Sequence, residues 1–302
     1  MSTIVIGNFD GVHRGHQAVL AQAKAHGGDC TVLTFDPHPT EVLGRTPPPR
    51  LVTNERRAEL LVRHGADDVV IEPFTKELAA TTPEDFAKNL LVGRLGAKAV
   101  VVGENFRFGK GRAGDLPLLR KLGSELGFTT LAADVARDEV GPFSSTRARD
   151  AVMSGDLEEA SRVLSRPHSL SGVVFTGDQR GRTLGFPTAN IAAEEMLPPY
   201  GVYAVLVDEV IGKQVSRALG PGVMNVGVRP TVDGKALRIE AHLFDFSRDL
   251  YGVRLRAHVI GRIRPEMRFE SFDALKEQIA KDAAHARVMT KGALPLSSGA
   301  YG

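Results

Sequence analysis

The chain has 302 residues, of which 42% are hydrophobic and 25% are charged, a balance typical of a soluble globular protein and not of a disordered or fibrous one. Its formal net charge of +2 is too small to indicate a nucleic-acid or membrane-surface partner, and no apolar run is long enough to span a bilayer. The single cysteine predicts a reducing, cytoplasmic setting, because it cannot form an internal disulfide. At this length two domains are expected.

The chain begins with a predicted buried strand, residues 3–6, followed by a glycine-rich turn and a helix over residues 17–24. Such a turn points backbone N–H groups and the positive end of the helix dipole at an anion. The spacing of His13 and His16 would put both imidazoles over one face of the helix start. Two imidazole donors there suit the charge that grows on a phosphorus atom undergoing substitution.

Two plainer interpretations of this histidine pair stay open. A His-x-x-His pair also occurs in partial metal sites and at solvated helix starts. The metal interpretation is the weaker one, because the chain has one cysteine, Cys30, and no second closely spaced histidine pair that would complete a zinc site. An ordinary turn at a helix start is the simpler alternative.

After the first helix, strands and helices continue to alternate. Strands are expected at residues 30–35, 68–71, 98–102 and 129–132, and helices at 54–64, 83–93 and 116–127. This alternation predicts an α/β fold, a Rossmann-like parallel sheet with helices on both faces. Ligands of such sheets bind beyond the carboxyl ends of the strands.

Three loops at those strand ends have unusual composition. Residues 34–39 present a histidine between two prolines, residues 103–109 enclose Asn105 between glycines, and residues 143–149 open a helix with three hydroxyls and two arginines. The first loop has a structural alternative as a rigid connection, and the third has one as a helix cap. Residues 109–114 also fit Gly-x-Gly-x-x-Gly, but the strand ends before them, and a dinucleotide fingerprint needs its first glycine at the strand-to-helix turn.

Together these segments resemble the FMN adenylyltransferase module of bacterial FAD synthetases, a nucleotidylyltransferase, over roughly residues 1–155. Its motifs recur in order: Gly-x-Phe-Asp-Gly-x-His-x-Gly-His, Thr-Phe-Asp-Pro-His-Pro, Gly-Glu-Asn-Phe-x-Phe-Gly and Ser-Ser-Thr-x-x-Arg. The resemblance implies that His13 and His16 stabilise the pentavalent transition state at the α-phosphorus of ATP. It also implies a nucleotide-binding set made of Gly7, Phe9, Asp10, Asn105, Ser145, Thr146 and Arg149.

The second half has a different pattern after a short helix expected at 156–164. Apolar or alternating runs at 172–175, 202–207, 236–244 and 255–260 predict a small antiparallel β-barrel, and a helix at 271–287 would close one side. We expect one domain at 1–164, a second at 165–290, and a flexible tail at 291–302.

The barrel half has its own candidate site in residues 180–190. Glycines beside arginines make a basic turn that a polyphosphate could enter, and Thr188 and Asn190 offer oxygen ligands to a hard cation. No Walker A pattern occurs in the sequence, so a P-loop kinase is excluded. A charged hairpin is the alternative. Glu240 lies in an alternating strand, where an outward-facing carboxylate is common; if it faces the phosphate loop, it could take a proton from an attacking alcohol.

Residues 167–290 resemble riboflavin kinase. The resemblance rests on Gly-Arg-x-Leu-Gly-Phe-Pro-Thr-Ala-Asn and on motifs at 201–204, 225–231 and 245–252. It implies that Thr188 and Asn190 bind Mg²⁺ with ATP and that Glu240 is the general base for the 5′-hydroxyl of riboflavin. It also implies nucleotide contacts from Gly181, Arg182, Gly185 and Pro187.

The resemblances together predict a bifunctional flavin-cofactor enzyme. The barrel would phosphorylate riboflavin to FMN, and the α/β domain would transfer AMP from ATP to FMN, giving FAD and pyrophosphate. The expected partners are ATP, riboflavin and FMN, with no nucleic acid and no membrane, and assembly into a homo-oligomer is left open. Two alternatives stay open as well: one active domain with a degenerate partner, and a non-enzymatic flavin-binding or regulatory protein.

Overall fold

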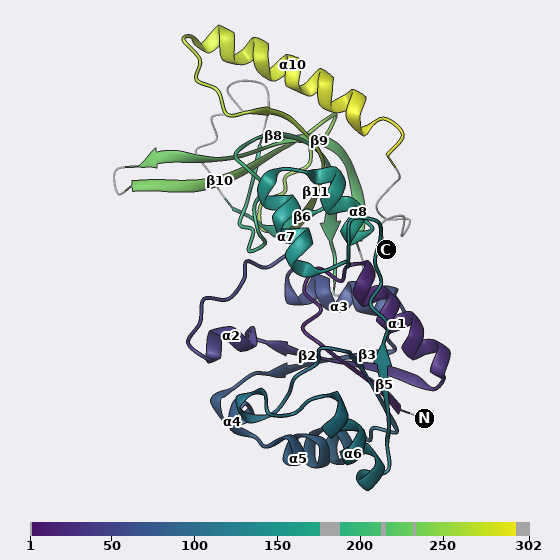
Figure 1. Cartoon of the computed structure of the whole chain (residues 1–302). Coiled ribbons are helices and arrows are strands. Elements are labelled where there is room, and N and C mark those ends of the chain that lie inside the picture. The colour runs from purple at the N-terminus through teal and green to yellow at the C-terminus, as the bar shows by residue number, and fades with distance from the viewer. Residues whose placement is uncertain (1, 176–187, 213–215, 232–233, 294–302) are drawn as a thin grey trace. The chain divides into compact units, whose positions relative to one another are not determined.

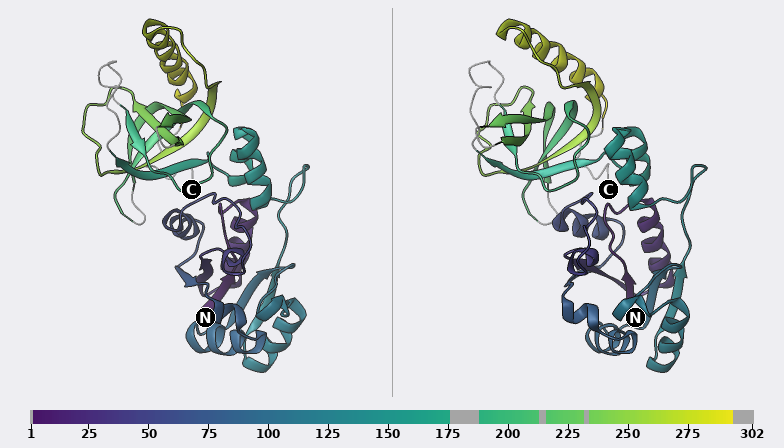
Figure 2. Two further views of the ribbon diagram at one scale, coloured as in Figure 1. Left: turned by 90° about the vertical axis from the view of Figure 1, so that its left-hand side faces the viewer. Right: turned by 60° about the vertical axis from the view of Figure 1, so that its left-hand side comes forward.

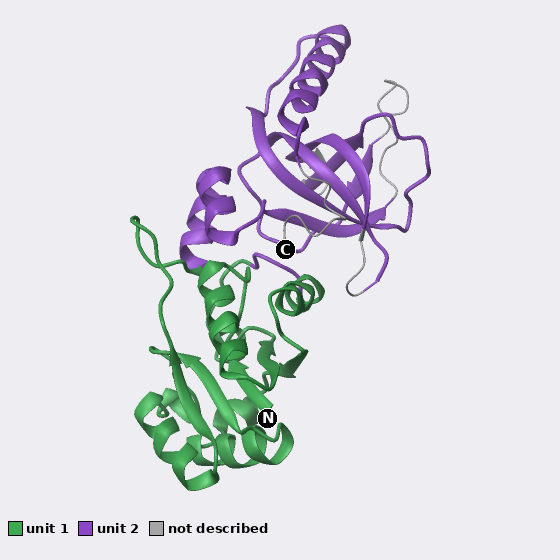
Figure 3. Cartoon of the chain, turned by 90° about the vertical axis from the view of Figure 1, so that its right-hand side faces the viewer, with its two compact units in different colours: residues 1–49, 54–144 green, residues 50–53, 145–302 purple. Residues whose placement is uncertain are grey.

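The computed structural model describes residues 2–175, 188–212, 216–231 and 234–293 (Figure 1). The chain divides into two compact units, which Figure 3 shows in different colours. The first unit comprises residues 1–49 and 54–144, and the second comprises residues 50–53 and 145–302. The short segment 50–53 belongs to the second unit, where the carbonyl of Arg50 accepts a hydrogen bond from the Met196 N–H at 2.6 Å.

The first unit is built on a five-stranded parallel sheet in the order β3-β2-β1-β4-β5. Its strands are β1 (Ser2–Ile6), β2 (Asp29–Asp36), β3 (Asp68–Pro73), β4 (Ala99–Gly103) and β5 (Thr129–Ala133). Strand β1 is central, and its run from Ile4 to Ile6 is buried, as expected for a strand covered on both faces. The predicted parallel sheet is therefore confirmed, and its strand ends gather at one edge.

Helices cover this sheet. They are α1 (Arg14–His26), α2 (Pro39–Val42), α3 (Asn54–Arg63), α4 (Lys76–Ala80), α5 (Pro83–Asp85), the π-helix η1 (Phe86–Arg94), the 3₁₀ turn η2 (Lys110–Arg112) and α6 (Leu116–Leu126). The helix predicted over 83–93 is present, but most of it is π-helical, and the Leu95 N–H donates to the carbonyl of Leu90, five residues back, at 3.0 Å. Leu91 and Leu119 pack with Val100 in the core of this unit.

The second unit is built on a closed antiparallel barrel in the order β10-β7-β6-β11-β8-β9. Its strands are β6 (Ser169–Phe175), β7 (Ala189–Ile191), β8 (Gly201–Val210), β9 (Ser216–Thr231), β10 (Gly234–Leu243) and β11 (Arg254–Pro265). The barrel closes because β10 pairs with β7 on one side and with β9 on the other. The predicted barrel is confirmed, and its core includes Tyr203, Met224 and Leu255, all fully buried.

The described helices that accompany the barrel are α7 (Ser145–Ser154), α8 (Leu157–Leu164) and α10 (Phe272–Thr290). Helix α10 contacts β8, β9 and β11 and lies along the outside of the barrel in both views of Figure 2. An ion pair anchors it, since Arg264 Nε lies 2.9 Å from a buried carboxylate oxygen of Asp282. Helices α7 and α8 belong to the same compact unit as the barrel. The predicted domain boundary between residues 164 and 165 stays a prediction.

Among the residues that the structure describes, no helix combines the length and the apolar character needed to cross a membrane. Residues 294–302 of the predicted tail lie outside the described part of the chain.

Candidate active sites

The β1–α1 turn, residues 7–16, has an unusual backbone. Phe9 and Val12 adopt positive φ angles of 49° and 40°, which non-glycine residues rarely do. The turn is closed by a 3.1 Å hydrogen bond from the Val12 N–H to the Phe9 carbonyl. It is tied to β2 by a second 3.1 Å bond, from the Gly7 N–H to the Leu33 carbonyl. Both Phe9 and Val12 are buried, so the surrounding core holds the turn in this shape.

The predicted histidine pair lies at the start of α1. His13 caps the helix, and its Nδ1 accepts a 3.1 Å hydrogen bond from the Gly15 N–H. Because Nδ1 is the acceptor, a neutral His13 carries its proton on Nε2. The rings of His13 and His16 are stacked with centroids 3.6 Å apart, and the Phe9 ring packs on His16 at 4.9 Å. The two imidazoles therefore share one face of the helix start, as their spacing predicts.

Two glycines of the turn allow close approaches. A Cβ at position 15 would lie 2.8 Å from the Phe143 carbonyl oxygen and 2.9 Å from the His13 ring. A Cβ at Gly7 would lie 3.0 Å from the Phe9 ring. Arg14 also lies over the Phe143 ring, 5.8 Å from its centroid. The segment before α7 thus packs on the start of α1, and this contact has no room for a side chain at position 15.

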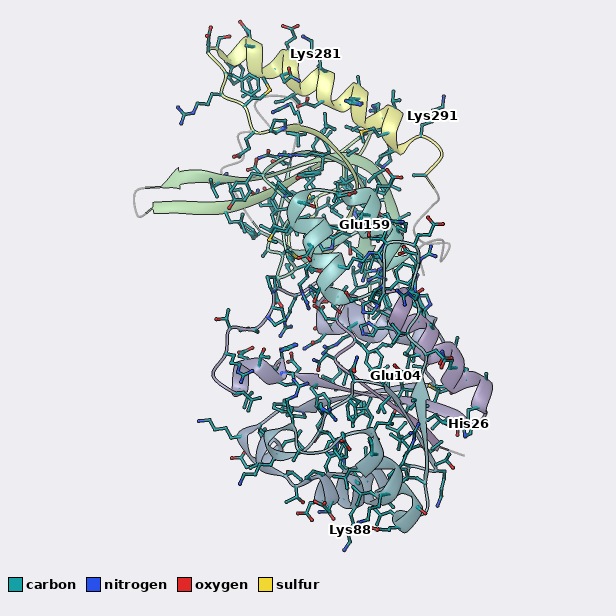
Figure 4. All side chains as sticks on the ribbon, viewed as in Figure 1. His26, Lys88, Glu104, Glu159, Lys281 and Lys291 are labelled. Carbon is teal, nitrogen blue, oxygen red and sulfur yellow. The ribbon has the colours of Figure 1, made fainter. Side chains whose placement is uncertain are left out.

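The other candidate residues of the first unit lie at the same edge of the sheet. Asp10 is buried in the turn. The β2 exit loop, residues 34–39, presents His38, whose Nε2 lies 3.3 Å from the Asn8 side-chain nitrogen. The loop after β4 carries Asn105 next to Glu104, which is labelled in Figure 4, and Asn105 is exposed. Since β1 lies between β2 and β4, these three strand ends are neighbours.

The remaining candidates of the N-terminal half lie on α7, in the second compact unit. Ser145 and Arg149 are half-buried there, and Thr146 is exposed. Arg147 Nε donates to Glu159 of α8 at 2.6 Å, which ties the two helices together. The predicted contact of Ser145, Thr146 and Arg149 with the nucleotide stays a prediction.

A second group of candidates lies on the barrel. Glu240 on β10 is directly opposite Asn190 on β7 and Asn225 on β9. Their neighbours Ala189, Ile239 and Ala241 belong to the barrel core. Because side chains alternate along a strand, Glu240 and the two asparagines share the outer face. The carboxylate therefore lies outside the barrel core, beside Asn190, and its predicted orientation toward the phosphate loop stays a prediction, because residues 180–187 lie outside the described part of the chain.

Arg238 holds the Glu240 carboxylate from the same strand. Its guanidinium donates to Glu240 Oε1 at 3.0 Å, and both side chains are partly buried. The two residues are two apart and therefore on one face of β10. Sequence analysis missed Arg238, although its spacing from Glu240 was the available signal.

A cavity of about 440 Å³ lies in the barrel unit, a size common for small-molecule sites. It is lined by Val174, Thr188, Ala189, Ala241, Leu243 and residues 246–251. Thr188, the predicted cation ligand two residues before Asn190, thus lines the same cavity as the loop between β10 and β11.

Arg248 from this loop donates a hydrogen bond to the Glu209 carboxylate. Together with Arg217, it holds the pKa of that carboxyl below its ordinary value.

The predicted contacts Gly181, Arg182, Gly185 and Pro187 lie outside the described residues. Among the described side chains, no group of three or more His, Cys, Asp and Glu could hold a metal ion.

Comparison with known proteins covers both halves. A family model described as FAD synthetase matches residues 1–147, and one described as riboflavin kinase matches residues 164–290. The bifunctional riboflavin kinase/FMN adenylyltransferase of Escherichia coli strain K12 is 41% identical over 290 residues, which is 94% of this chain and 91% of that protein. The protein of the same name from Pseudomonas fluorescens is 39% identical over 291 residues, with the same coverage of both chains.

A solved structure shares the fold of nearly the whole chain. The crystal structure of a macrolide-efflux protein from Streptococcus pneumoniae matches with a TM-score of 0.82 and 29% identity, over 95% of this chain and 93% of that chain.

Proposed function

Because the chain belongs to the family of bifunctional riboflavin kinase/FMN adenylyltransferases, we propose which of its side chains perform each of the two reactions. The C-terminal part phosphorylates riboflavin with ATP to give FMN. The N-terminal part transfers the adenylyl group of ATP to FMN, giving FAD and pyrophosphate. ATP, riboflavin and FMN are thus its small-molecule substrates.

For adenylyl transfer, His13 and His16 are the catalytic residues. A phosphate oxygen of FMN attacks the α-phosphorus of ATP while the bond to pyrophosphate breaks, and negative charge grows on the oxygens of that phosphorus. Imidazole N–H donors beside the N-terminus of α1 would stabilise this charge. The observation that carries the proposal is the stacked pair of rings at the start of the helix, in a turn that the core holds rigid.

The other nucleotide contacts are proposed to come from Gly7, Phe9, Asp10 and Asn105, with Ser145, Thr146 and Arg149 from α7. Support comes from the shared edge of β1, β2 and β4 and from the packing of Phe143, two residues before α7, on the start of α1. Gly181, Arg182, Gly185 and Pro187 are proposed for the nucleotide of the kinase, on the strength of the sequence motif alone.

For the kinase, Glu240 is proposed to accept the proton of the riboflavin 5′-hydroxyl as that oxygen attacks the γ-phosphorus of ATP and the bond from this phosphorus to ADP breaks. Thr188 and Asn190 would hold Mg²⁺ with the nucleotide, and their hydroxyl and amide oxygens are ligands of the hard class that this ion prefers. The register of β7 and β10, which sets Asn190 opposite Glu240, supports this assignment. When bound, Mg²⁺ would neutralise charge on the phosphates.

One assay reads both reactions. The purified chain is incubated with riboflavin, ATP and Mg²⁺, and the flavins are separated by chromatography. Accumulation of FMN and FAD together supports the proposed pair of sites. FMN without FAD would leave only the kinase site active. Unchanged riboflavin would contradict the kinase assignment, and adenylyl transfer is then assayed with added FMN.

Gly15→Ala is expected to lower the rate of FAD formation by about 100-fold, because small displacements of reacting groups have effects of this size. The new methyl group would collide with the Phe143 carbonyl and the His13 ring. FMN formation by the same chain should be unchanged. Gly212→Ala is the matched control, since a Cβ there meets nothing within 4 Å. Normal FAD formation by Gly15→Ala would mean that adenylyl transfer does not depend on the exact position of the His13 ring, which would contradict this prediction.

Asn190→Ala is expected to raise the Mg²⁺ concentration that gives half-maximal FMN formation by about tenfold or more, an effect typical of lost support at a metal site. The Mg²⁺ dependence of FAD formation from added FMN should not move. Asn225→Ala is the control, because it removes the amide on the other side of Glu240. An unchanged Mg²⁺ dependence in Asn190→Ala would contradict the cation assignment.

The chain is also proposed to work in the cytoplasm. Its only cysteine, Cys30, is a buried free thiol, and its phosphoryl and adenylyl donor is ATP.

A further inference from the structure

Arg57 of α3 is a buried arginine that joins two loops of the first unit. It is 8% exposed. Its Nη1 donates to the Asn8 carbonyl at 2.9 Å, and its Nη2 donates to the Phe35 carbonyl at 3.1 Å and to Asn54 Oδ1 at 2.8 Å. Asn8 lies two residues beyond the end of β1, and Phe35 is the last residue but one of β2. One guanidinium therefore binds the exits of two neighbouring strands.

Asn8 is the point at which these contacts meet. Its carbonyl also accepts a 3.0 Å hydrogen bond from the Thr34 hydroxyl, and its side-chain nitrogen lies 3.3 Å from His38 Nε2. The next residue in the chain, Phe9, has a positive φ and packs on the His16 ring. A shift of Asn8 would therefore move Phe9 and, through it, the ring of His16.

The chemistry of arginine explains why this residue type is suited to the position. Burying a guanidinium is unfavourable unless its N–H groups are hydrogen-bonded, and here the carbonyls of Asn8 and Phe35 accept hydrogen bonds from it. The guanidinium is planar, and its donors have fixed directions, so it sets the separation of the two carbonyls. Lysine has a single ammonium group and cannot fix two acceptors in this way.

We propose that Arg57 is a positioning residue for adenylyl transfer, an inference that rests on the proposed roles of His13 and His16. It holds the β1–α1 turn at a fixed distance from the β2 exit loop. The two imidazoles then meet the α-phosphorus of ATP in the geometry of the reaction. Arg57 acts through Asn8 and Phe9 and needs no contact with the substrates.

The test uses Arg57→Met and Arg57→Lys in the full chain. The methionine variant is expected to lower kcat for FAD formation by about 10- to 100-fold, while KM for ATP and FMN stays near its original value. The lysine variant should be intermediate, because it keeps the positive charge and a single donor group that cannot hold both carbonyls in fixed directions. FMN formation by the same chain is the internal control. Arg63→Met is the matched variant, since Arg63 donates to Glu59 on its own helix at 3.1 Å.

Thr34→Val supplies an independent measurement at the same acceptor. It removes the other hydrogen bond to the Asn8 carbonyl and nearly preserves side-chain shape. A smaller loss of kcat for FAD formation is expected. Because both donors act on one carbonyl, the double variant with Arg57→Met should lose less than the product of the two single effects.

Several results would overturn the inference. They are unchanged FAD formation in Arg57→Met, a rise in KM without a fall in kcat, or an equal loss of both reactions. If Arg57→Met does not fold, Arg57→Lys and Thr34→Val decide the question by the same readouts. His16→Ala is assayed alongside: if it still forms FAD at the normal rate, the proposed site has failed, whereas a loss in His16→Ala alone rejects only the role of Arg57.

Discussion

His16→Ala is expected to lower the rate of FAD formation from FMN and ATP by about 100- to 1,000-fold, the usual loss when one donor to a developing negative charge is removed. The same chain should still convert riboflavin to FMN, so FMN accumulates. The expectation follows from the stacking of His16 on His13 at 3.6 Å, which places both rings where they can bind one phosphoryl group. Chromatographic separation of the flavins during a time course measures both rates at once.

His26→Ala is the matched control for this variant. His26 is an exposed histidine in the last turn of the same helix, and it is labelled in Figure 4. It should leave both rates unchanged. Comparable losses in His26→Ala and His16→Ala would assign the effect to helix α1 as a whole. A loss of FMN formation in folded His16→Ala would contradict the division of the two reactions between the two halves of the chain.

Glu240→Ala is expected to lower the rate of FMN formation by about 100- to 10,000-fold, the range in which a general base contributes. FAD formation from added FMN should continue. Glu240→Gln should have nearly the same effect, because it preserves the shape and the acceptor for Arg238 but cannot take a proton. The measurement is the same flavin separation, performed once with riboflavin and once with FMN as the starting flavin.

A surface carboxylate provides the control for Glu240. Glu277 pairs with Lys281 on α10 and is largely exposed, so Glu277→Gln should form FMN at the normal rate. If Glu240→Gln retains most of the kinase rate, the proton is accepted elsewhere, and Glu240 would then have only the role of binding Arg238.

The main elements of the fold follow from local patterns in the sequence. Strands such as β4 are continuous apolar runs because both faces of the parallel sheet are covered, and that composition is visible in one sequence. Strand β9 was not predicted, because Gly220, Pro221 and Gly222 interrupt it and are typical of turns. Its pairing with both β8 and β10 is tertiary and overrides the local preference. The π-helical form of η1 likewise has no signature in apolar spacing.

The candidate sites were predictable only where neighbours in sequence are neighbours in space. The shared face of His13 and His16 followed from their spacing in α1. Arg57 was missed because arginine in a polar helix is usually solvated, and its acceptor Asn8 is 49 residues away. The environment of Glu240 depended on strand register, which placed Asn190 opposite it. The roles of Ser145 and Arg149 stay predictions because they lie on a different compact unit from the histidines.

The left-handed backbone at Phe9 and Val12 is unfavourable for the stability of this turn. Each such conformation costs on the order of 1–3 kcal/mol, and neither residue is a glycine, for which it would cost little. A chain selected only for resistance to unfolding would have glycine at these two positions, where the left-handed conformation costs little free energy. The relaxed turn would then sample several conformations, and the two imidazoles would spend less time in the stacked arrangement that we propose for adenylyl transfer.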